Sequence, residues 1–581
     1  MSLKNWRVNL IFPLLILFSI PIFWRLFDLQ ILKGSFYKAL AQGQQSALSQ
    51  TEPKRGDIYF KNGEILAATK EEPFLRVCVK DFEKKEEAAA AISQILKQEK
   101  EEILKIIDTG EGFYKTVKEN LSKEEVDGIN DLKMKGVEVA WQYKRLYPNL
   151  NTGSQIAGFL NKDGQGQYGL EAYFNDSLTG EEKFENKKVT PWGFLFSSSE
   201  NSSSQDNDLH LTVDYSIQFE AEKILKVGVE KYGAKSGEIL VAEPATGKII
   251  AMAQYPNFDP NKYGESAMEN FSNKSIQTVF EPGSIFKPIT IAIALNEGKI
   301  TPETLFYDDV GYRQVSGYKV YNYSQKAWGT RKMYESLQYS INVGVMDAET
   351  LIGNQTFYDY LVNRFELNDE TGIELAGEIV SPSQNKELKK ALDNNIQVTF
   401  ANASFGQGVE MTPLQIVRAF CGLANKGQMP EKIQIIENKV VNGKIESFNN
   451  QTFKTLISQE NSEKLVKMMI NVVENGYGHL AKIPGYYVAG KTGTSQMSYA
   501  YLGQDKAGYS TTDTWQTFMG FAPAYNPRFV MLVKLDNPAN SKTSEYSAVP
   551  MFHDLAKYIL DRWQITPDYD PDLATTSQKI Y

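Results

Sequence analysis

Histidine and cysteine are scarce in this sequence. Its 581 residues include only three histidines and two cysteines. Two cysteines, Cys78 and Cys421, are too few for a disulfide-stapled scaffold or for a zinc site built from thiolates. The three histidines are His210, His479 and His553. With so few, we expect that any hydrolase or transferase chemistry in this chain does not depend on a histidine base.

A basic excess is also missing. Lysine and arginine number 62 and aspartate and glutamate 71, which gives a formal net charge of −9. This balance argues against a general nucleic-acid binder, which would show a basic excess. Hydrophobic residues at 42% and charged residues at 23% are ordinary for globular proteins. They exclude a wholly disordered chain, a collagen and a coiled coil.

One long hydrophobic run stands near the N-terminus. Residues 8–24, VNLIFPLLILFSIPIFW, contain no charged side chain, and Lys4 and Arg7 precede them. A helix that crosses a bilayer needs about 20 mostly apolar residues, and a basic flank stays on the cytoplasmic side. We expect a cytoplasmic N-terminus over residues 1–7, a single uncleaved anchor over 8–30 and an extracytoplasmic remainder.

Two other interpretations of this run are less well supported. For a cleaved signal peptide, Ala39-Leu40-Ala41 resembles a cleavage site, but it lies too far beyond the apolar run. A buried core helix is disfavoured because the run opens the chain behind basic residues. Both features favour the anchor.

Three stretches follow the anchor. Residues 31–205 are mixed and polar, and their Lys- and Glu-rich part, 81–133, is typical of helices with a solvated face. Residues 196–208 form a serine-rich run that cannot bury a core, so we expect a linker or exposed loop. Most of the apolar periodicity lies in 206–565. The Asp- and Thr-rich tail, 566–581, is expected to be disordered.

The stretch 206–565 contains strand-like runs at both of its ends. The turn Ala245-Thr246-Gly247 predicts a hairpin between the first two runs. Strands from both ends with helices between them indicate one antiparallel sheet covered by helices. The expected strands are 236–244, 248–254, 486–492, 515–521 and 529–535, and the clearest helices are 286–295 and 413–424.

A serine–lysine pair could provide a nucleophile and its base without a histidine. In Ser284-Ile285-Phe286-Lys287 the two polar residues are three positions apart, so on a helix they share one face. A lysine can activate a serine nucleophile once burial or a neighbouring cation lowers its pKa from about 10.4. Pro288 fits the first helical turn, and the apolar residues after it predict a buried helix.

Two companion motifs follow in order, Ser340-Ile341-Asn342 and Lys491-Thr492-Gly493. Each short pattern also occurs elsewhere, so the context has to decide. The ordered rival set is Ser383, Ser447 and Lys491, but both of its serines lie in charged, polar surroundings. We favour the set built on Ser284 because its serines stand beside apolar segments. Lys491 is expected at the end of a strand, with Gly493 leaving room for a substrate backbone.

These motifs carry a family resemblance. FEPGSIFKP, SIN and AGKTGTSQ resemble the penicillin-binding transpeptidases, and more specifically the class B penicillin-binding proteins. Arg55-Gly56-Asp57-Ile58, RLYPN and GQYGLE resemble boxes of that family's N-terminal domain, although Tyr59-Phe60-Lys61 departs from the usual acidic-basic pair. The similarity covers residues 8–565.

The resemblance implies an α+β penicillin-binding transpeptidase fold over 206–565, with a five-stranded antiparallel sheet covered by helices. It also implies an N-terminal pedestal of the dimerisation type over 31–205, one transmembrane helix and a bacterial cytoplasmic membrane location. The implied partners are peptidoglycan stem peptides, β-lactams and a membrane lipid-II polymerase of the shape, elongation, division and sporulation class. No metal or organic cofactor is implied.

The resemblance also implies roles for the motif residues in cross-linking D-Ala-D-Ala stem peptides. Ser284 attacks the donor, Lys287 takes its proton, and Ser340 passes a proton to the leaving D-alanine. Asn342 orients Lys287 and the substrate amide. Lys491 and Thr492 bind the substrate's terminal carboxylate, Gly493 lets the substrate backbone approach, and the backbone N–H groups of Ser284 and Thr494 form an oxyanion hole. None of the three histidines is expected to be catalytic.

Other functions on the same motifs are a D,D-carboxypeptidase or a β-lactamase. The long pedestal and the anchor argue against the lactamase. A β-lactam sensor would carry more spanning helices, and a non-enzymatic scaffold would not need intact motifs. The compact segment between Ser284 and Ser340, and TGIELAGE at residues 371–378, resemble the cell-division branch more than the elongation branch.

Overall fold

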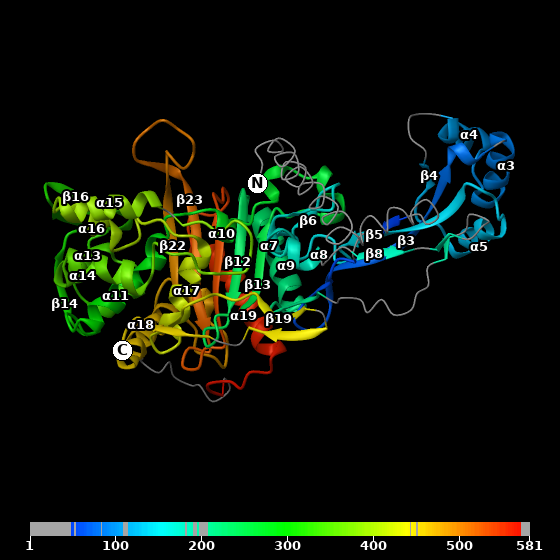
Figure 1. The fold of residues 1–581 in the computed structure, drawn as a ribbon. Helices are drawn as coiled ribbons and strands as arrows, with labels where there is room; N and C mark the ends of the chain where they lie inside the picture. The colour runs from blue at the N-terminus through cyan, green and yellow to red at the C-terminus, as the bar shows by residue number, and fades with distance from the viewer. Residues whose placement is uncertain are drawn as a thin grey trace, which may run out of the picture. The chain divides into compact units, whose positions relative to one another are not determined.

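The structure is a computed structural model, shown in Figure 1, and the residues that it describes form two compact units. The described residues are 48–51, 54–82, 84–108, 114–179, 183–186, 188–189, 195–196, 207–380, 382–441, 443–448 and 451–570. The first unit comprises Met1–Gly56, Thr69–Lys144 and Thr179–Gln205, as far as these are described, and the second comprises Asp57–Ala68, Arg145–Leu178 and Asp206–Tyr581.

The first unit packs short helices on strands. Its main strands are β3 (Ile65–Cys78, of which residues 69–78 lie in this unit), β4 (Tyr114–Lys118) and β5 (Val137–Leu146), and its helices are α3 (Lys85–Leu96), α4 (Lys100–Asp108) and α5 (Lys123–Asp131). Leu75, Ile92 and Ile103 are buried in its core, whereas Glu87 and Glu101 are exposed. The expected solvated helix faces are therefore confirmed for these helices.

Other strands of the first unit form small pairs. β1 (Leu48–Thr51) pairs with β8 (Lys183–Asn186), and β9 (Lys188–Val189) pairs with β10 (Leu195–Phe196), both antiparallel. The rest of the serine-rich run, residues 197–206, lies outside the described residues.

The second unit holds the remaining elements. Its strands are β2 (Ile58–Tyr59), β6 (Phe159–Leu160), β7 (Gly166–Gln167), β11 (Leu209–Leu211), β12 (Ser236–Ala242), β13 (Ile249–Tyr255), β14 (Leu305–Asp309), β15 (Tyr312–Val315), β16 (Tyr318–Tyr321), β17 (Gly329–Lys332), β18 (Gln428–Pro430), β19 (Ile436–Val441), β20 (Lys444–Ser447), β21 (Phe453–Thr455), β22 (Ala489–Ser498), β23 (Tyr509–Ala522) and β24 (Phe529–Asp536). Its helices of four or more residues are α6 (Ser154–Ala157), α7 (Gly169–Tyr173), α8 (Asn175–Thr179), α9 (Tyr215–Tyr232), η4 (Pro260–Glu265), α10 (Lys274–Gln277), η6 (Gly283–Phe286), α11 (Lys287–Asn296), α12 (Met333–Gln338), α13 (Asn342–Ile352), α14 (Asn354–Asp359), η8 (Tyr360–Arg364), α15 (Pro382–Asp393), α16 (Gln397–Ala403), α17 (Pro413–Ala424), α18 (Gln459–Asn475) and α19 (Ala548–Arg562).

The central sheet of this unit has five antiparallel strands in the order β13-β12-β24-β23-β22. The expected hairpin and the expected second pair are confirmed as β12–β13 and β23–β24. The limits predicted for the fifth strand are wrong, because β22 begins at Ala489 and continues to Ser498. Its polar second half is held in the sheet by β23, which is long enough to pair Thr494 with Gln516.

Both faces of this sheet are covered. Ile239 and Val241 of β12 belong to the cluster that includes α9 and α19, whereas Leu240 and Ala242 belong to the cluster that includes α11 and α17. Side chains of a strand alternate between faces, and all seven residues of β12 are buried. The prediction of one antiparallel sheet covered by helices is confirmed.

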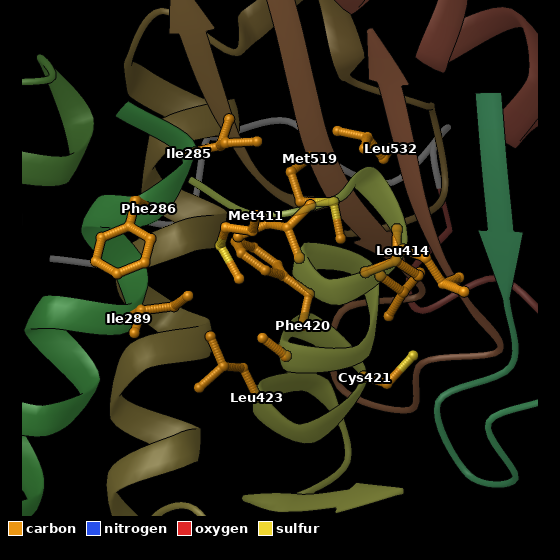
Figure 2. Packing of buried hydrophobic residues seen from close by; sticks show 14 of the residues in the cluster. Ile285, Phe286, Ile289, Met411, Leu414, Phe420, Cys421, Leu423, Met519 and Leu532 are labelled. Atoms are coloured by element: carbon orange, nitrogen blue, oxygen red, sulfur yellow. The ribbon is translucent and has the colours of Figure 1, made fainter. Parts of the chain in front are cut away.

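Helix α17 links the sheet to the helices on one face. It begins at a capping box in which Thr412 accepts from the backbone of Gln415, and it has the predicted limits. Figure 2 shows Leu414 and Phe420 of α17 beside Met519 of β23 and Phe286 at the start of the helix that follows Ser284. The Ser284 segment therefore lies directly on the hydrophobic core.

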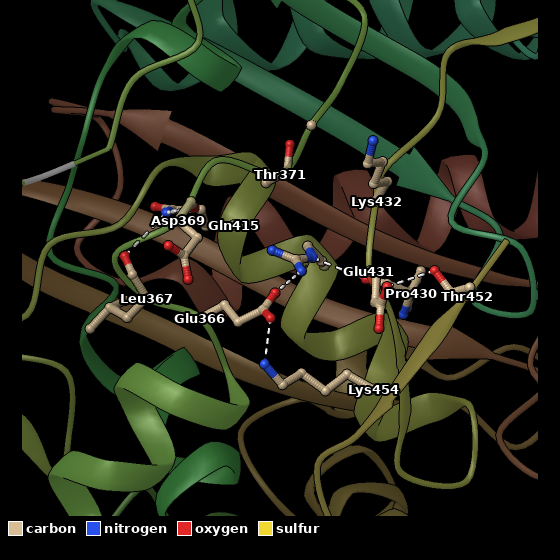
Figure 3. A network of polar contacts seen from close by, with 12 residues as sticks. Glu366, Leu367, Asp369, Thr371, Gln415, Pro430, Glu431, Lys432, Thr452 and Lys454 are labelled. Carbon is tan, nitrogen blue, oxygen red and sulfur yellow. Dashed lines mark hydrogen bonds and ion pairs between the residues drawn. The ribbon is translucent and has the colours of Figure 1, made fainter.

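A polar network on the same helix ties down the surrounding loops (Figure 3). Glu366 accepts hydrogen bonds from Arg418 of α17 and, at 2.5 Å, from Lys454 of β21. The TGIELAGE segment lies nearby and is closed by Glu378, which accepts from the backbone N–H of Thr371 at 2.7 Å. The first and last residues of this motif, Thr371 and Glu378, are therefore the ones that close the loop.

Segments ahead of residue 206 complete the second unit through charge pairing. The buried Arg145 guanidinium lies 2.7 Å from Glu171 and 3.8 Å from Asp57, and the hydroxyl of Tyr147 donates to Glu171 at 3.1 Å. These residues come from the three N-terminal motif boxes. Their mutual contacts explain why residues 57–68 and 145–178 fold with the sheet.

The expected anchor, residues 8–30, lies outside the described residues, and no helix in the described ranges has the length and apolar character of a membrane span. The expectation of a disordered tail is wrong for its first residues. Asp568 donates its N–H to the Gly485 carbonyl at 2.8 Å and accepts from the N–H of Tyr487 at 2.9 Å. These bonds hold the start of the tail against the segment that precedes β22.

The core around α17 leads to a stability prediction. Phe420 is 0% exposed and Phe219 on α9 is 49% exposed. Phe420→Ala should lower the free energy of unfolding by about 3–5 kcal/mol because it leaves a cavity, whereas Phe219→Ala should change it by less than about 0.5 kcal/mol. Denaturant unfolding of both variants measures this, and equal midpoints would contradict the described packing.

Candidate active site

The three sequence motifs meet at one cleft in the second unit. Ser284, Ser340 and Thr492 line a cavity of about 1450 Å³. Ser284 comes from η6, Ser340 from the turn before α13, and Thr492 from β22. The cleft is therefore built from segments that lie about 55 to 210 residues apart in the chain.

The segment that carries Ser284 is a tight helical start. η6 runs directly into α11, where Pro288 occupies the first turn as predicted, and the carbonyl of Ser284 accepts from the backbone N–H of Lys287. Gly283 has a φ of +57° and donates its N–H to the Gly406 carbonyl at 3.0 Å. A Cβ at Gly283 would lie 2.8 Å from the Cβ of Ser495. The left-handed backbone and the close approach both explain the glycine.

Gly493 is also needed for packing, for a reason different from the expected one. A Cβ there would lie 2.3 Å from the Thr517 hydroxyl and 2.9 Å from the Cγ2 of Ile285. The sequence interpretation reserved this space for a substrate backbone. In the structure it is filled by the chain's own atoms, so the glycine lets the Ser284 segment approach β22.

Two lysines converge on Ser340. The Nζ of Lys287 donates to the carbonyl of Ser340 at 2.6 Å and lies 3.2 Å from its hydroxyl oxygen. The Nζ of Lys491 donates to the same hydroxyl oxygen at 3.0 Å and to the Thr492 carbonyl at 2.9 Å. Ser340 has a φ of +55°, a conformation uncommon for residues other than glycine.

Burial controls the charge of both lysines. Lys287 and Lys491 are each 0% exposed. Burial, with a smaller contribution from Lys491, holds the pKa of Lys287 well below its usual value. Burial lowers the pKa of Lys491 to about 7. Burial therefore favours the neutral amine of Lys287, and Lys491, with a pKa of about 7, is close to half charged at neutral pH.

The structure gives Asn342 and Thr494 partners that the sequence did not predict. Asn342 begins α13 and lines the cleft, but among the described residues its amide nitrogen donates to the Tyr321 carbonyl at 2.8 Å rather than contacting Lys287. Asn342 therefore makes no direct hydrogen bond to Lys287, although we expected it to orient that lysine. The hydroxyl of Thr494 accepts from the N–H of Ser544 at 3.2 Å.

One supporting contact was missed because its partners lie far apart in the chain. Glu281, three residues before Ser284, is buried, and both of its oxygens lie 3.0 Å from the Tyr509 hydroxyl, which donates to the carboxylate. Burial raises the pKa of Glu281 to about 7. The contact joins the Ser284 segment to the first residue of β23, and no spacing in the sequence reveals it.

The rival serines and two of the three histidines lie away from the cleft. Ser447 on β20 is exposed and donates to Asn438 at 2.7 Å, and Ser383 lies in α15. His210 stacks on Tyr59 at 5.0 Å, and His553 lies on α19. His479 alone lies near the cleft, with its Nδ1 3.4 Å from the carboxylate of Glu545, a lining residue.

Comparisons with known proteins agree with this geometry. The family description "Penicillin binding protein transpeptidase domain" matches residues 237–557, and "Penicillin-binding Protein dimerisation domain" matches residues 50–211. Stage V sporulation protein D of Bacillus subtilis is 30% identical over 557 residues, covering 93% of this chain and 83% of that protein. The Peptidoglycan D,D-transpeptidase FtsI homolog of Mesostigma viride is 28% identical over 561 residues, covering 92% of each chain.

A solved structure, penicillin-binding protein 2X of Streptococcus thermophilus, aligns with a TM-score of 0.75 at 21% identity, covering 88% of this chain and 80% of that one. This likeness supports the fold. The transpeptidase match covers more than half of the sequence, and the dimerisation match precedes it. The chain therefore belongs to the class B penicillin-binding proteins, in which a transpeptidase domain follows a dimerisation domain.

Proposed function

We propose that this chain is a membrane-anchored peptidoglycan D,D-transpeptidase that forms an acyl-enzyme on Ser284 and transfers the acyl group to an amine. The observation that carries the proposal is the pair of buried lysines that share the Ser340 hydroxyl at a cleft lined by Ser284. The names of relatives such as the Mesostigma viride protein support the same reaction.

The first half-reaction uses the neutral Lys287. The Oγ of Ser284 attacks the carbonyl carbon of the penultimate D-alanine, and its proton passes to Lys287. The new C–O bond replaces the peptide C–N bond, and the leaving D-alanine amine receives a proton through Ser340. The lowered pKa of Lys287 supports this role, because a charged ammonium could not accept the proton.

The substrate's charges fit the rest of the cleft. Lys491 and Thr492 are proposed to hold the terminal carboxylate of the donor, with Gly493 bringing their strand close to Ser284. Backbone N–H groups of Ser284 and Thr494 would stabilise the oxyanion, at about 2.7–4 kcal/mol for each donor. Asn342, which lines the cleft, would then contact the substrate amide rather than Lys287.

The cellular setting is part of the proposal. Residues 8–30 would anchor the chain in the bacterial cytoplasmic membrane with the cleft outside, and a membrane lipid-II polymerase would supply the glycan strands. We place the reaction at the division septum. The resemblance of the compact segment between Ser284 and Ser340, and of residues 371–378, to the division branch supports this choice over elongation.

Covalent labelling tests the nucleophile. Fluorescent penicillin should label the wild-type chain, and Ser284→Ala should reduce labelling by at least about a thousandfold because no acyl acceptor remains. Ser383→Ala and Ser447→Ala, which change the rival serines, should label normally. Labelling of Ser284→Ala would overturn the assignment, and rapid release of the wild-type adduct would favour a β-lactamase.

The two lysines predict a bell-shaped pH dependence for acylation. The second-order rate constant for penicillin should fall by up to about tenfold per pH unit above pH 7, as Lys491, with a pKa of about 7, loses the charge that attracts the carboxylate. On the acid side it should fall when Lys287 becomes protonated. Penicillin methyl ester, which lacks that carboxylate, should show no alkaline decline. The same decline for the ester would contradict the role of Lys491.

Depletion of the protein tests the cellular role. Loss of septal cross-linking should give filamentous cells under phase-contrast microscopy. Round cells would indicate elongation instead. Normal growth with defective spores would point to sporulation, the process for which the Bacillus subtilis relative is named.

A further inference from the structure

Among the described residues that line the cleft, basic side chains outnumber acidic ones. Among the described lining residues, Lys319, Lys326 and Lys542 are basic, and Glu545 is the one carboxylate. The basic groups attract the negatively charged carboxylate of the donor. The second substrate of the proposed reaction is an amine, which is a cation in water, and it needs a partner of the opposite charge.

Glu545 lines the same cleft as Ser284 and Ser340. It belongs to η10 (Ser544–Tyr546), which contacts both β22 and β23. Its neighbour Ser544 is tied to Thr494 by hydrogen bonds of 3.2 and 3.3 Å. Glu545 is thus one residue away from a contact with a proposed oxyanion donor.

An aromatic pair lies on the Ser340 side of the cleft. The backbone N–H of Tyr477 donates to the Gln338 carbonyl at 3.4 Å, and the rings of Tyr477 and Tyr339 meet edge-to-face at 6.2 Å. Both tyrosines line the cleft. His479, two residues after Tyr477, has its Nδ1 3.4 Å from the carboxylate of Glu545, which places Glu545 beside this segment. Burial and the charge of Glu545 both raise the pKa of Tyr477.

The same wall already binds a cation of this chain. The Nζ of Lys326 lies 3.6 Å from the centre of the Trp328 ring, and Trp328 stacks on Tyr339 at 4.9 Å. Aromatic faces attract ammonium groups, and a carboxylate beside them adds a charge-assisted hydrogen bond. The side chain of Glu545 keeps 17% of its surface exposed, and the half-exposed imidazole of His479 lies 3.4 Å from it.

We propose that Glu545, with the ring of Tyr477, binds the ammonium group of the acceptor and so delivers a primary amine to the acyl-enzyme. This inference rests on the proposed function and names the site for its second substrate. The bound ammonium first loses one proton to the solvent that reaches the exposed part of Glu545. The neutral nitrogen then attacks the ester carbon, a C–N bond forms, the C–O bond to Ser284 breaks, and the second proton passes through Lys287 to the Ser284 oxygen.

The test compares how fast the acyl-enzyme reacts with an amine acceptor and with an uncharged alcohol acceptor. The full-length chain is acylated with a depsipeptide donor that ends in D-Ala-D-lactate, and the products are measured with D-alaninamide or methanol as the acceptor. Glu545→Gln keeps the shape but removes the charge. It should lower the ratio of aminolysis to hydrolysis by about ten- to a hundredfold, the effect of one charge-assisted hydrogen bond, and leave methanolysis within about twofold.

Matched variants complete the experiment. Glu446→Gln, on exposed β20, should behave as wild type, Glu545→Asp should recover part of the aminolysis, and Tyr477→Leu should weaken aminolysis more than Tyr477→Phe. Equal aminolysis by Glu545→Gln and wild type, or an equal loss of methanolysis, would overturn the inference. Failure of the proposed function would show differently, because the wild type would then form no acyl-enzyme on Ser284.

Discussion

The rest of the active site depends on two buried lysines, Lys287 and Lys491, whose amino groups both contact the hydroxyl of Ser340. Burial disfavours the charged form of each lysine. Lys287 on α11 and Lys491 on β22 both reach the hydroxyl of Ser340, so the sheet, the Ser284 helix and the turn before α13 must all be in place. Both lysines bind protons more weakly in the folded chain than in the unfolded chain. As the pH falls below about 10.4, protonation therefore favours the unfolded state. The reactive amine exists at a cost to stability, which the packing in Figure 2 must offset.

A third buried lysine, on the same sheet as Lys491, has the opposite protonation preference. Lys534 of β24 lies 3.1 Å from Glu238 and 2.5 Å from Asp536. Burial alone would lower its pKa, but these carboxylates raise it, so Lys534 stays charged. The state of each lysine follows from its neighbours: a buried lysine keeps its charge beside carboxylates and loses it beside another lysine and neutral oxygens. The polar network of Figure 3 follows the first pattern, because Glu366 receives both Arg418 and Lys454.

Much of this arrangement could be predicted from local sequence. The turn at Ala245-Thr246-Gly247 indicated the β12–β13 hairpin, and apolar spacing indicated α17 and the helix after Ser284. The limits of β22 could not be predicted, because its polar half has no apolar pattern and belongs to the sheet through its backbone pairing with β23. Contacts such as Tyr509 with Glu281 join residues far apart in the chain and leave no periodic pattern. The sequence identified Gly493 as important, but its role in packing could be recognised only from the positions of Thr517 and Ile285 in the structure.

The order of the central sheet has a consequence for how the chain is made. Strand β12 lies between β13, its near neighbour in sequence, and β24, which is synthesised almost three hundred residues later. At about 5–20 residues per second, the β12–β13 hairpin has one unpaired apolar edge for roughly 15 to 60 s during translation. Such an edge is a template for pairing with other chains. The second unit therefore has a high contact order, and its cleft forms only after the last strand of the sheet has been added.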